Sequence, residues 1–387
     1  MLMSRVIDSI RHRNLARLTA RCDSQYLDAE PWVLDQLDVA DDGVKIGGWA
    51  LPPIDPNTSA TFAINGQPFD RLDYPREIPI FKDSLWMRPR AEAAGFRAER
   101  RQPRAKLFCD GFISISFNFP GRPVRAPYRS AWYRPTLPSY HSTWYFRDPS
   151  LQIALPDTKR RYRVIGSESE DMFSLGGFTD FMRMNALLED RFQFGYRDCQ
   201  RILDWGCGCG RVARYFATVP GVDFHGGDID PDNVSWCHDN LKFGTFHHLP
   251  LHPPTRLAEG SFDLVYGISV FTHLRENVQF SWLQELNRIL KPGGIALATI
   301  HGPTTMNYAM MPAEHHRLIT QRIETEGFVI TASNDQIDDV VEDKDYYVNV
   351  AHSRNYIRKQ WGQTFEVVDI LPGFIWTHDL VVLRKRL

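Results

Sequence analysis

Three glycines at alternate positions, Gly206, Gly208 and Gly210, follow a short apolar run in the stretch "RILDWGCGCGR" at residues 201–211. Glycine lets the chain turn sharply and lets a ligand approach the bare main chain. The apolar run predicts a buried strand, and the residues after the glycines predict a helix. In open parallel sheets the first turn of this kind is where ligands bind. The stretch therefore predicts an α/β domain with a ligand site at this turn.

Strand and helix patterns alternate along the second half of the chain. The predicted strands are residues 201–205, 222–228, 262–268 and 294–301, and the predicted helices are 178–190, 210–218, 231–242 and 276–290. This alternation is typical of a parallel sheet covered by helices on both faces. The tail "FEVVDILPGFIWTHDLVVLRK" predicts two strands joined by a short loop, so the final strand must be antiparallel.

The first half has a different pattern, which divides the chain into four parts. Residues 36–119 read as short strands with hairpin turns at Asp42-Gly43 and Asn65-Gly66, which predicts a small β-sandwich-like module. A connector rich in proline and aromatic residues follows at 120–165, where prolines disfavour long helices and central strands. An N-terminal helical arm at 1–35 and an α/β domain at 166–387 complete the division.

Composition limits the partners and the compartment. The 387 residues carry 45 Lys and Arg against 47 Asp and Glu, so no overall basic field favours nucleic acid. The six cysteines lack paired spacings, and no apolar run is long enough for a membrane span, which favours the cytoplasm. The arm is basic and amphipathic, so it suits either weak contact with an anionic membrane surface or packing on a partner. The sequence does not predict an oligomeric state.

Two acids beside the glycine loop indicate which ligand it holds. The segment "GCGRVA" fits a dinucleotide pattern, but Asp204 before the loop would repel a pyrophosphate and would attract a cationic ammonium group. Asp228 ends the second strand, where a carboxylate can accept both hydroxyls of a ribose. Asp230 is predicted instead to cap the helix that begins at Pro231. A ligand with an ammonium end and a ribose matches S-adenosylmethionine.

Four motifs in order resemble those of class I S-adenosylmethionine-dependent methyltransferases: "ILDWGCGCGR", "GGDIDPDNVSWCHDNL", "SFDLVYGISVFTHL" and "LNRILKPGGIALATIHG". The resemblance covers about residues 166–387 and implies a Rossmann-like seven-stranded sheet with an antiparallel final strand. The residues "GCGCGR", "SVFTHL" and "IHG" within these motifs are most similar to bacterial methyltransferases of polysaccharide and glycan gene neighbourhoods. The first half resembles small β-sandwich modules fused to glycan-modifying enzymes.

The resemblance also implies which residues bind the cofactor. It places Asp204 and the three glycines around the methionine part, Asp228 on the ribose, Ile229 on the adenine and Ser269 beneath the sulfonium. Where relatives carry an acid or amide for the adenine amino group, this chain has "TFHHLPLHPP", so His247, His248 or a backbone carbonyl must serve.

Few catalytic residues are needed when the cofactor carries its own leaving group. A base would help a hydroxyl acceptor, and the candidates are His273 and His301, although each is equally well explained by a structural role. No metal site is predicted, because Cys207 and Cys209 lie in the ligand loop. The expected function is methyl transfer to a small-molecule or glycan-like acceptor at oxygen. The alternatives are a non-catalytic nucleoside- or glycan-binding protein and an NAD(P)-dependent oxidoreductase.

Overall fold

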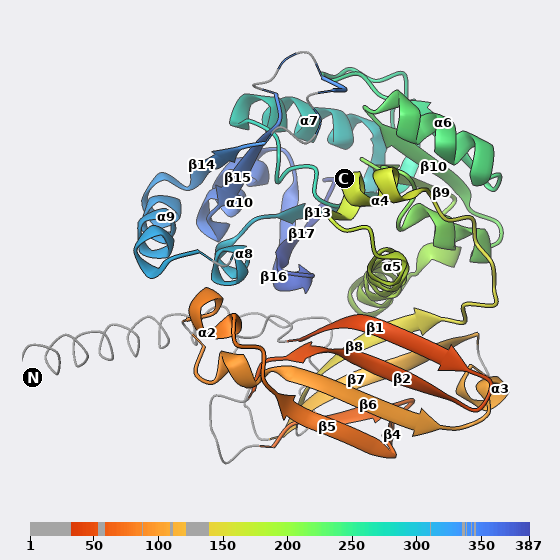
Figure 1. The fold of residues 1–387 in the computed structure, drawn as a ribbon. Helices are drawn as coiled ribbons and strands as arrows, with labels where there is room; N and C mark the ends of the chain where they lie inside the picture. Colours follow the sequence, from red (N-terminus) through yellow and green to blue (C-terminus); the bar gives the residue numbers. More distant parts are fainter. Residues whose placement is uncertain are drawn as a thin grey trace, which may run out of the picture.

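The computed structural model describes residues 32–52, 59–86, 88–108, 111–120, 139–309, 311–334, 337, 339–341, 343 and 346–387 (Figure 1). Of residues 118–120 and 139–143 it describes the strands and not the side chains. The predicted arm at 1–35 lies outside the described residues as far as residue 31, and the last part of that range already belongs to the first strand.

Two four-stranded antiparallel sheets form the N-terminal β module, in the orders β1-β2-β6-β5 and β4-β3-β7-β8. The strands are β1 (Trp32–Ala40), β2 (Gly43–Ala50), β3 (Thr61–Ile64), β4 (Gln67–Pro68), β5 (Arg71–Arg76), β6 (Gly95–Arg101), β7 (Phe112–Pro120) and β8 (Ser139–Arg147). The short helices are α2 (Phe81–Ser84), η1 (Ala91–Ala93) and α3 (Arg104–Leu107). Trp32, Phe62, Phe117 and Trp144 are buried in one core between the sheets. The predicted all-β unit and both of its hairpins are confirmed.

The β module extends further along the chain than residue 119. Strand β8 comes from the segment predicted as a connector and pairs antiparallel with β7 at the edge of its sheet. Residues 139–148 contain no proline, and Trp144 and Phe146 alternate into the core, which is the pattern of a strand. The abundance of proline on either side had hidden this short run.

The C-terminal domain contains a seven-stranded sheet in the order β11-β10-β9-β12-β13-β17-β16. Strand β17 runs in the opposite direction to the other six strands. Its strands are β9 (Arg201–Trp205), β10 (Asp223–Asp228), β11 (Gly244–His248), β12 (Phe262–Gly267), β13 (Leu290–Ile300), β16 (Glu366–Ile375) and β17 (His378–Arg384). The predicted α/β fold and its antiparallel final strand are confirmed.

Helices cover this sheet on both faces. They are α4 (Thr158–Ile165), α5 (Glu170–Phe192), η2 (Tyr196–Asp198), η3 (Ala213–Thr218), α6 (Pro231–Asn240), α7 (Glu276–Ile289), α8 (Pro303–Tyr308), α9 (Ala313–Glu326), α10 (Arg354–Gln360) and η4 (Trp361–Gln363). A two-stranded sheet, β14 (Phe328–Ser333) and β15 (Val348–His352), is inserted before α10. The predicted cap of α6 is confirmed, since Asp230 Oδ1 accepts the amide of Asp232.

The helix predicted at 210–218 differs from the structure. The helical turn is η3, a 3₁₀ helix that begins at Ala213. The residues just before it pack against α5, because a Cβ added to Gly177 would lie 2.3 Å from the carbonyl oxygen of Arg211. This close approach of α5 coincides with the delayed helix start.

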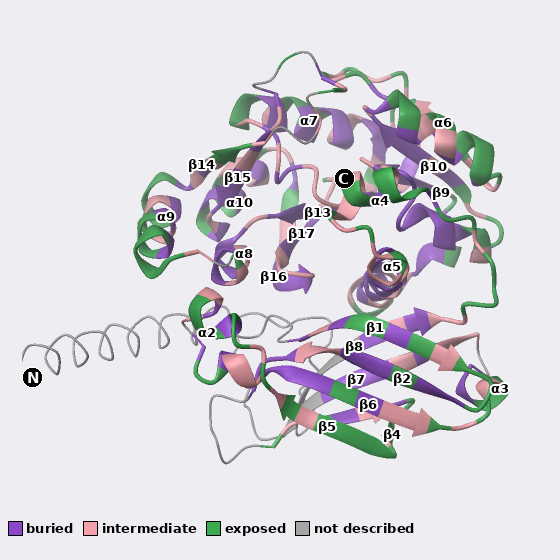
Figure 2. Cartoon of the chain, viewed as in Figure 1, coloured by how far each residue is buried: buried purple, intermediate pink, exposed green. Residues whose placement is uncertain are grey.

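Helix α5 lies between the two parts of the molecule and contacts both (Figures 1 and 2). It is buried on most of its circumference, whereas the outer strand β5 of the module is largely exposed. The hydroxyl of Thr179 on α5 accepts the amide of Tyr145 on β8 at 3.2 Å and donates to its carbonyl at 3.1 Å. Thus α5 satisfies backbone groups of the edge strand and joins the module to the α/β domain.

Candidate functional site

A cavity of about 450 Å³ lies at the carboxyl ends of the parallel strands. Strands β9, β10 and β12 and the loops after them contribute Gly206, Gly208, Asp228, Ile229, Ser269 and His273. The turn between β16 and β17 contributes residues 375–378, and α4 contributes residues 163–165. The strand order reverses between β9 and β12, which is where open α/β sheets bind ligands.

The glycine loop has a backbone that only glycine adopts easily. Gly206 has φ of 79°, and a Cβ there would lie 2.3 Å from the side chain of Val270. Gly208 has φ of 51°, and a Cβ there would lie 2.9 Å from Val164. Gly210 also has a positive φ of 77° but is buried away from the cavity. Side chains at the first two positions would occupy the space where the cavity meets the main chain.

Asp228 ends β10 and connects the loop to its neighbours. One carboxylate oxygen accepts the amide of Gly208 at 2.7 Å, and the other accepts the amide of Asp230 at 2.8 Å. A carboxylate has about four lone-pair sites, so further acceptor capacity borders the cavity. Burial raises the pKa of Asp228 to about 6, although the two amides act in the opposite direction. The residue is therefore close to its titration point near neutral pH.

Asp204 lies beneath the loop and does not border the cavity. Its side chain is buried on the α5 side of the sheet, next to Tyr266 of the adjacent strand. Burial raises its pKa to about 7, with Arg211 acting to lower it and Asp228 to raise it. Arg211 does border the cavity, and its guanidinium donates to buried Asp180 at 2.6 Å.

Helix α4, from the segment predicted as a connector, covers the glycine loop. Val164 packs on Gly208, and Arg163 forms an ion pair of 2.6 Å with Asp230. Arg163 also pairs with Asp339 of the insertion between β14 and β15. Tyr346 from the same insertion borders the cavity. Helix α4 and this insertion therefore both border the cavity.

The other end of the cavity contains a histidine from the final hairpin. His378 opens β17, and its Nδ1 lies 3.4 Å from Oγ of Ser269. Its ring meets that of His301 edge to face, with 4.7 Å between the ring centroids. Ser269 has φ of 58°, a costly conformation for a residue other than glycine, and its amide donates to Thr299 Oγ1 at 2.7 Å.

Two further histidines are held nearby. The ring of His273 stacks on Tyr347 at 4.3 Å, and its Nδ1 lies 3.4 Å from the side-chain amide nitrogen of Asn334. His301 donates from Nδ1 to the carbonyl of Val350 at 3.1 Å. His273 borders the cavity, whereas His301 lies behind it.

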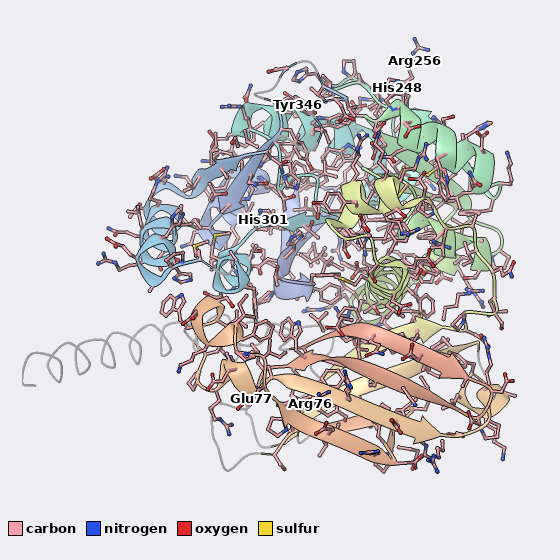
Figure 3. The ribbon with its side chains drawn as sticks, in the orientation of Figure 1. Arg76, Glu77, His248, Arg256, His301 and Tyr346 are labelled. Carbon is pink, nitrogen blue, oxygen red and sulfur yellow. The ribbon has the colours of Figure 1, made fainter. Side chains whose placement is uncertain are left out.

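All three histidines favour the neutral form. Burial lowers the pKa of His273 to about 3 and that of His301 to about 4, and it also lowers the pKa of His378. Figure 3 labels His301 inside the domain, in contrast to Arg256, which points outward at the rim. At pH 7 this end of the cavity therefore presents uncharged imidazoles.

Of the residues predicted from the sequence, six border the cavity: Gly206, Gly208, Asp228, Ile229, Ser269 and His273. Asp204, Gly210 and His301 do not border it. Neither His247 nor His248 does so, and Leu249 occupies that position next to Ile229.

Sequence reasoning missed Val164, Trp376 and His378. For His378 a signal existed, because a strand antiparallel to its neighbours begins at the edge where the parallel strands end.

Within the described residues no group of three or more His, Cys, Asp or Glu side chains is arranged to hold a metal ion. Cys207 and Cys209 are free and buried. The hydrogen bond with Cys237, together with burial, raises the pKa of Cys207, and burial raises that of Cys209. Among the same residues, no helix is both long and apolar enough to cross a membrane.

Comparison with known proteins identifies the central part of the chain. Residues 202–294 match a family described as "Methyltransferase domain". Methyltransferase GfsG of Streptomyces halstedii is 27% identical over 112 residues, which are 26% of this chain and 37% of that protein. Demethylmenaquinone methyltransferase of Chlorobaculum parvum is 28% identical over 126 residues, 31% of this chain and 48% of that protein. The chain therefore spans less than half the length of these relatives.

Among solved structures, the PH0226 protein from Pyrococcus horikoshii OT3 aligns with a TM-score of 0.40 and 16% identity, covering 58% of this chain and 98% of that one. The family match covers strands β9 to β12 and the start of β13 in this sheet. The fold is the Rossmann-like seven-stranded methyltransferase sheet with an antiparallel final strand, preceded by a small all-β module.

Proposed function

We propose that this chain, which carries a methyltransferase domain at residues 202–294, transfers a methyl group from S-adenosylmethionine to the oxygen of a small-molecule or glycan-like acceptor. The observation that carries the proposal is the cavity bordered by Gly206, Gly208 and Asp228 at the point where the strand order reverses. A side chain at either glycine would narrow the cavity, and the carboxylate of Asp228 next to them can accept further hydrogen bonds.

The residues fit the cofactor as follows. Asp228 would accept the ribose hydroxyls, Ile229 and Leu249 would flank the adenine, and the amides of the loop would face the methionine part. Asp204, which lies beneath the loop, would attract the ammonium group of the methionine part when its carboxyl group is ionised. The bound cofactor supplies an electrophilic methyl group with its own leaving group, so the protein needs only to bind, orient and exclude water. Helix α4 and the insertion supply that cover.

The acceptor is assigned to the end of the cavity formed by residues 375–378, His273 and Tyr347. Support comes from the aromatic rings there, which suit the faces of sugar or aryl rings. Among the described residues, two arginines border the cavity and both are in ion pairs, Arg211 with Asp180 and Arg163 with Asp230 and Asp339. These features favour an uncharged hydroxylated acceptor of the kind expected from the sequence.

Calorimetric titration with S-adenosylmethionine and S-adenosylhomocysteine tests the proposal. We expect micromolar binding, and we expect Asp228→Ala to weaken it by about 2 kcal/mol or more, the scale of hydrogen bonds to charged groups. Asp239→Asn, on an exposed part of α6, is the control and should bind as the wild type does. Absence of binding by the wild type would refute the proposal, and binding of NADH instead would favour an oxidoreductase.

A further inference from the structure

The acceptor end contains three histidines that could serve a hydroxyl acceptor, and their surroundings differ. His301 donates through Nδ1 to a backbone carbonyl and lies behind the cavity wall. His273 borders the cavity, but its ring lies against Tyr347 and its Nδ1 is next to Asn334. His378 borders the cavity, lies next to Ser269 at the end of β12 and contacts the ring of His301.

We propose that His378 is the base that takes the proton of the acceptor hydroxyl, with Ser269 as the residue that fixes its tautomer. This inference rests on the proposed function. Its basis is that the ring borders the cavity, that Nδ1 has Ser269 Oγ at 3.4 Å, and that Nε2 makes no hydrogen bond to the described residues.

The contact of 3.4 Å between Nδ1 and Ser269 Oγ accommodates either tautomer, and a base at Nε2 requires the one in which Nδ1 carries the proton. If Nδ1–H donates to Oγ of Ser269, the lone pair of the neutral ring lies on Nε2, the nitrogen without a partner. Ser269 is itself held by the bond from its amide to Thr299 and by its left-handed backbone. The edge of one ring against the face of the other, between His301 and His378, limits rotation of the imidazole. His378 is therefore oriented by two neighbours on two different strand ends.

The charged and titratable groups that face His378 keep its ring neutral. They are His301 at the end of β13, His273 after β12 and Arg211 after β9, and each of these lowers the pKa of His378 in addition to burial. Arg211 is paired with Asp180. The adjacent carboxylate, Asp379, bonds to Arg354 and to the amide of Gly373 instead. The ring is therefore neutral at working pH and keeps one nitrogen lone pair that can accept a proton.

The step balances without any further reactant. The hydroxyl proton of the acceptor moves to Nε2, the acceptor oxygen forms a bond to the methyl carbon, and the bond between that carbon and sulfur breaks with its electron pair remaining on sulfur. The imidazolium then returns the proton to water. An acceptor methylated at a hydroxyl oxygen would need this step, whereas a neutral amine would not need a base before attack.

Nitrogen-15 NMR of the histidines tests the inference directly, with S-adenosylhomocysteine as the probe. At pH 7 we expect His378 to be protonated at Nδ1 and bare at Nε2, both free and with the probe bound. We expect Ser269→Ala to shift the tautomer toward Nε2–H while Ser269→Thr keeps it. A wild-type ring protonated at Nε2 would overturn the inference. The signals that disappear in His378→Gln are assigned to His378. His315→Gln, which replaces an exposed histidine of α9, is the control and should leave those signals unchanged.

Turnover gives a second readout for any hydroxylated acceptor that the wild type methylates. His378→Gln should bind S-adenosylhomocysteine within twofold of the wild type and lower kcat by 100-fold or more, the usual contribution of a general base. Retention of kcat within threefold would overturn the inference. Failure of the probe to bind the wild type would instead refute the proposed function, and the tautomer can be measured in the free protein in either case.

Discussion

The two ends of the cavity are built by different means. At one end the ligand would face main chain and carboxylates, contributed by one contiguous loop and the next strand end, around Gly206, Gly208 and Asp228. At the other end it would face neutral histidines and aromatic rings from widely separated segments, including Tyr347, Trp376 and His378. The difference teaches that a short motif can specify one ligand through its backbone geometry and charge. The second ligand, the proposed acceptor, would instead contact side chains that only the completed fold brings together.

The ion pair between Arg211 and Asp180 lies at the cavity wall, and breaking it should have the largest effect. Asp180 is 1% exposed and Arg211 is 8% exposed, so Asp180→Ala leaves an uncompensated buried cation. We expect a loss of about 3–5 kcal/mol of unfolding free energy, measured by urea denaturation. Glu366→Ala, which breaks an exposed pair with Arg384, should cost less than about 1 kcal/mol. Equal losses in both variants would contradict the buried role.

A substitution at Gly206 should disable the loop end alone. Alanine there would have to adopt a φ of 79°, and its Cβ would clash with the side chain of Val270. We expect the free energy of unfolding to fall by about 2 kcal/mol or more, and we expect no detectable binding of S-adenosylhomocysteine. Gly221→Ala is the matched control, since its φ is 85° and nothing lies within 4 Å of the added Cβ. That variant should lose about 1 kcal/mol and bind normally. Normal binding by Gly206→Ala would show that the loop does not hold the ligand.

Acidity should weaken binding at the carboxylate end. The pKa of Asp228 is raised to about 6, so its ionised form is present at pH 8 and mostly lost at pH 5. If the ionised form accepts the ribose hydroxyls, affinity for S-adenosylhomocysteine should fall about tenfold over this range. Calorimetry at several pH values measures the change, and Asp228→Asn should remove this contribution.

The effect of the same carboxylate on folding has the opposite sign. Because its pKa is raised in the folded state, it binds a proton more tightly there than in the unfolded chain. Its contribution to stability is therefore present below about pH 4 and is lost as the pH rises through about 6.

Removal of an aromatic ring from the other end should have the smallest effect on cofactor binding. Trp376 borders the cavity and contacts Trp144 of the β module, with 6.4 Å between the ring centroids. We expect Trp376→Leu to leave affinity for S-adenosylhomocysteine within twofold while raising KM for an acceptor. A fall in that affinity of more than fivefold would mean that the two ends do not act independently.

The loop end could be predicted from the sequence because its physics is local. Positive φ values demand glycine, a strand end positions Asp228, and the cap before Pro231 is read from neighbouring residues. The other end could not be read in this way. His378 follows a turn whose place at the sheet edge depends on the pairing of β17 with β13, and Val164 reaches Gly208 only because α4 folds back over the loop. Strand β8 was missed because prolines on either side conceal a short run of alternating residues.

The hydroxyl of Thr179 has a consequence for how the two parts of this molecule can be separated. It occupies the amide and the carbonyl of Tyr145 on an edge strand, which would otherwise be open to pairing with another chain. A fragment cut between the β module and α5 would expose this edge as a template for aggregation. The β module should therefore stay soluble on its own only if α5 remains attached to it, because α5 covers the backbone groups of that strand.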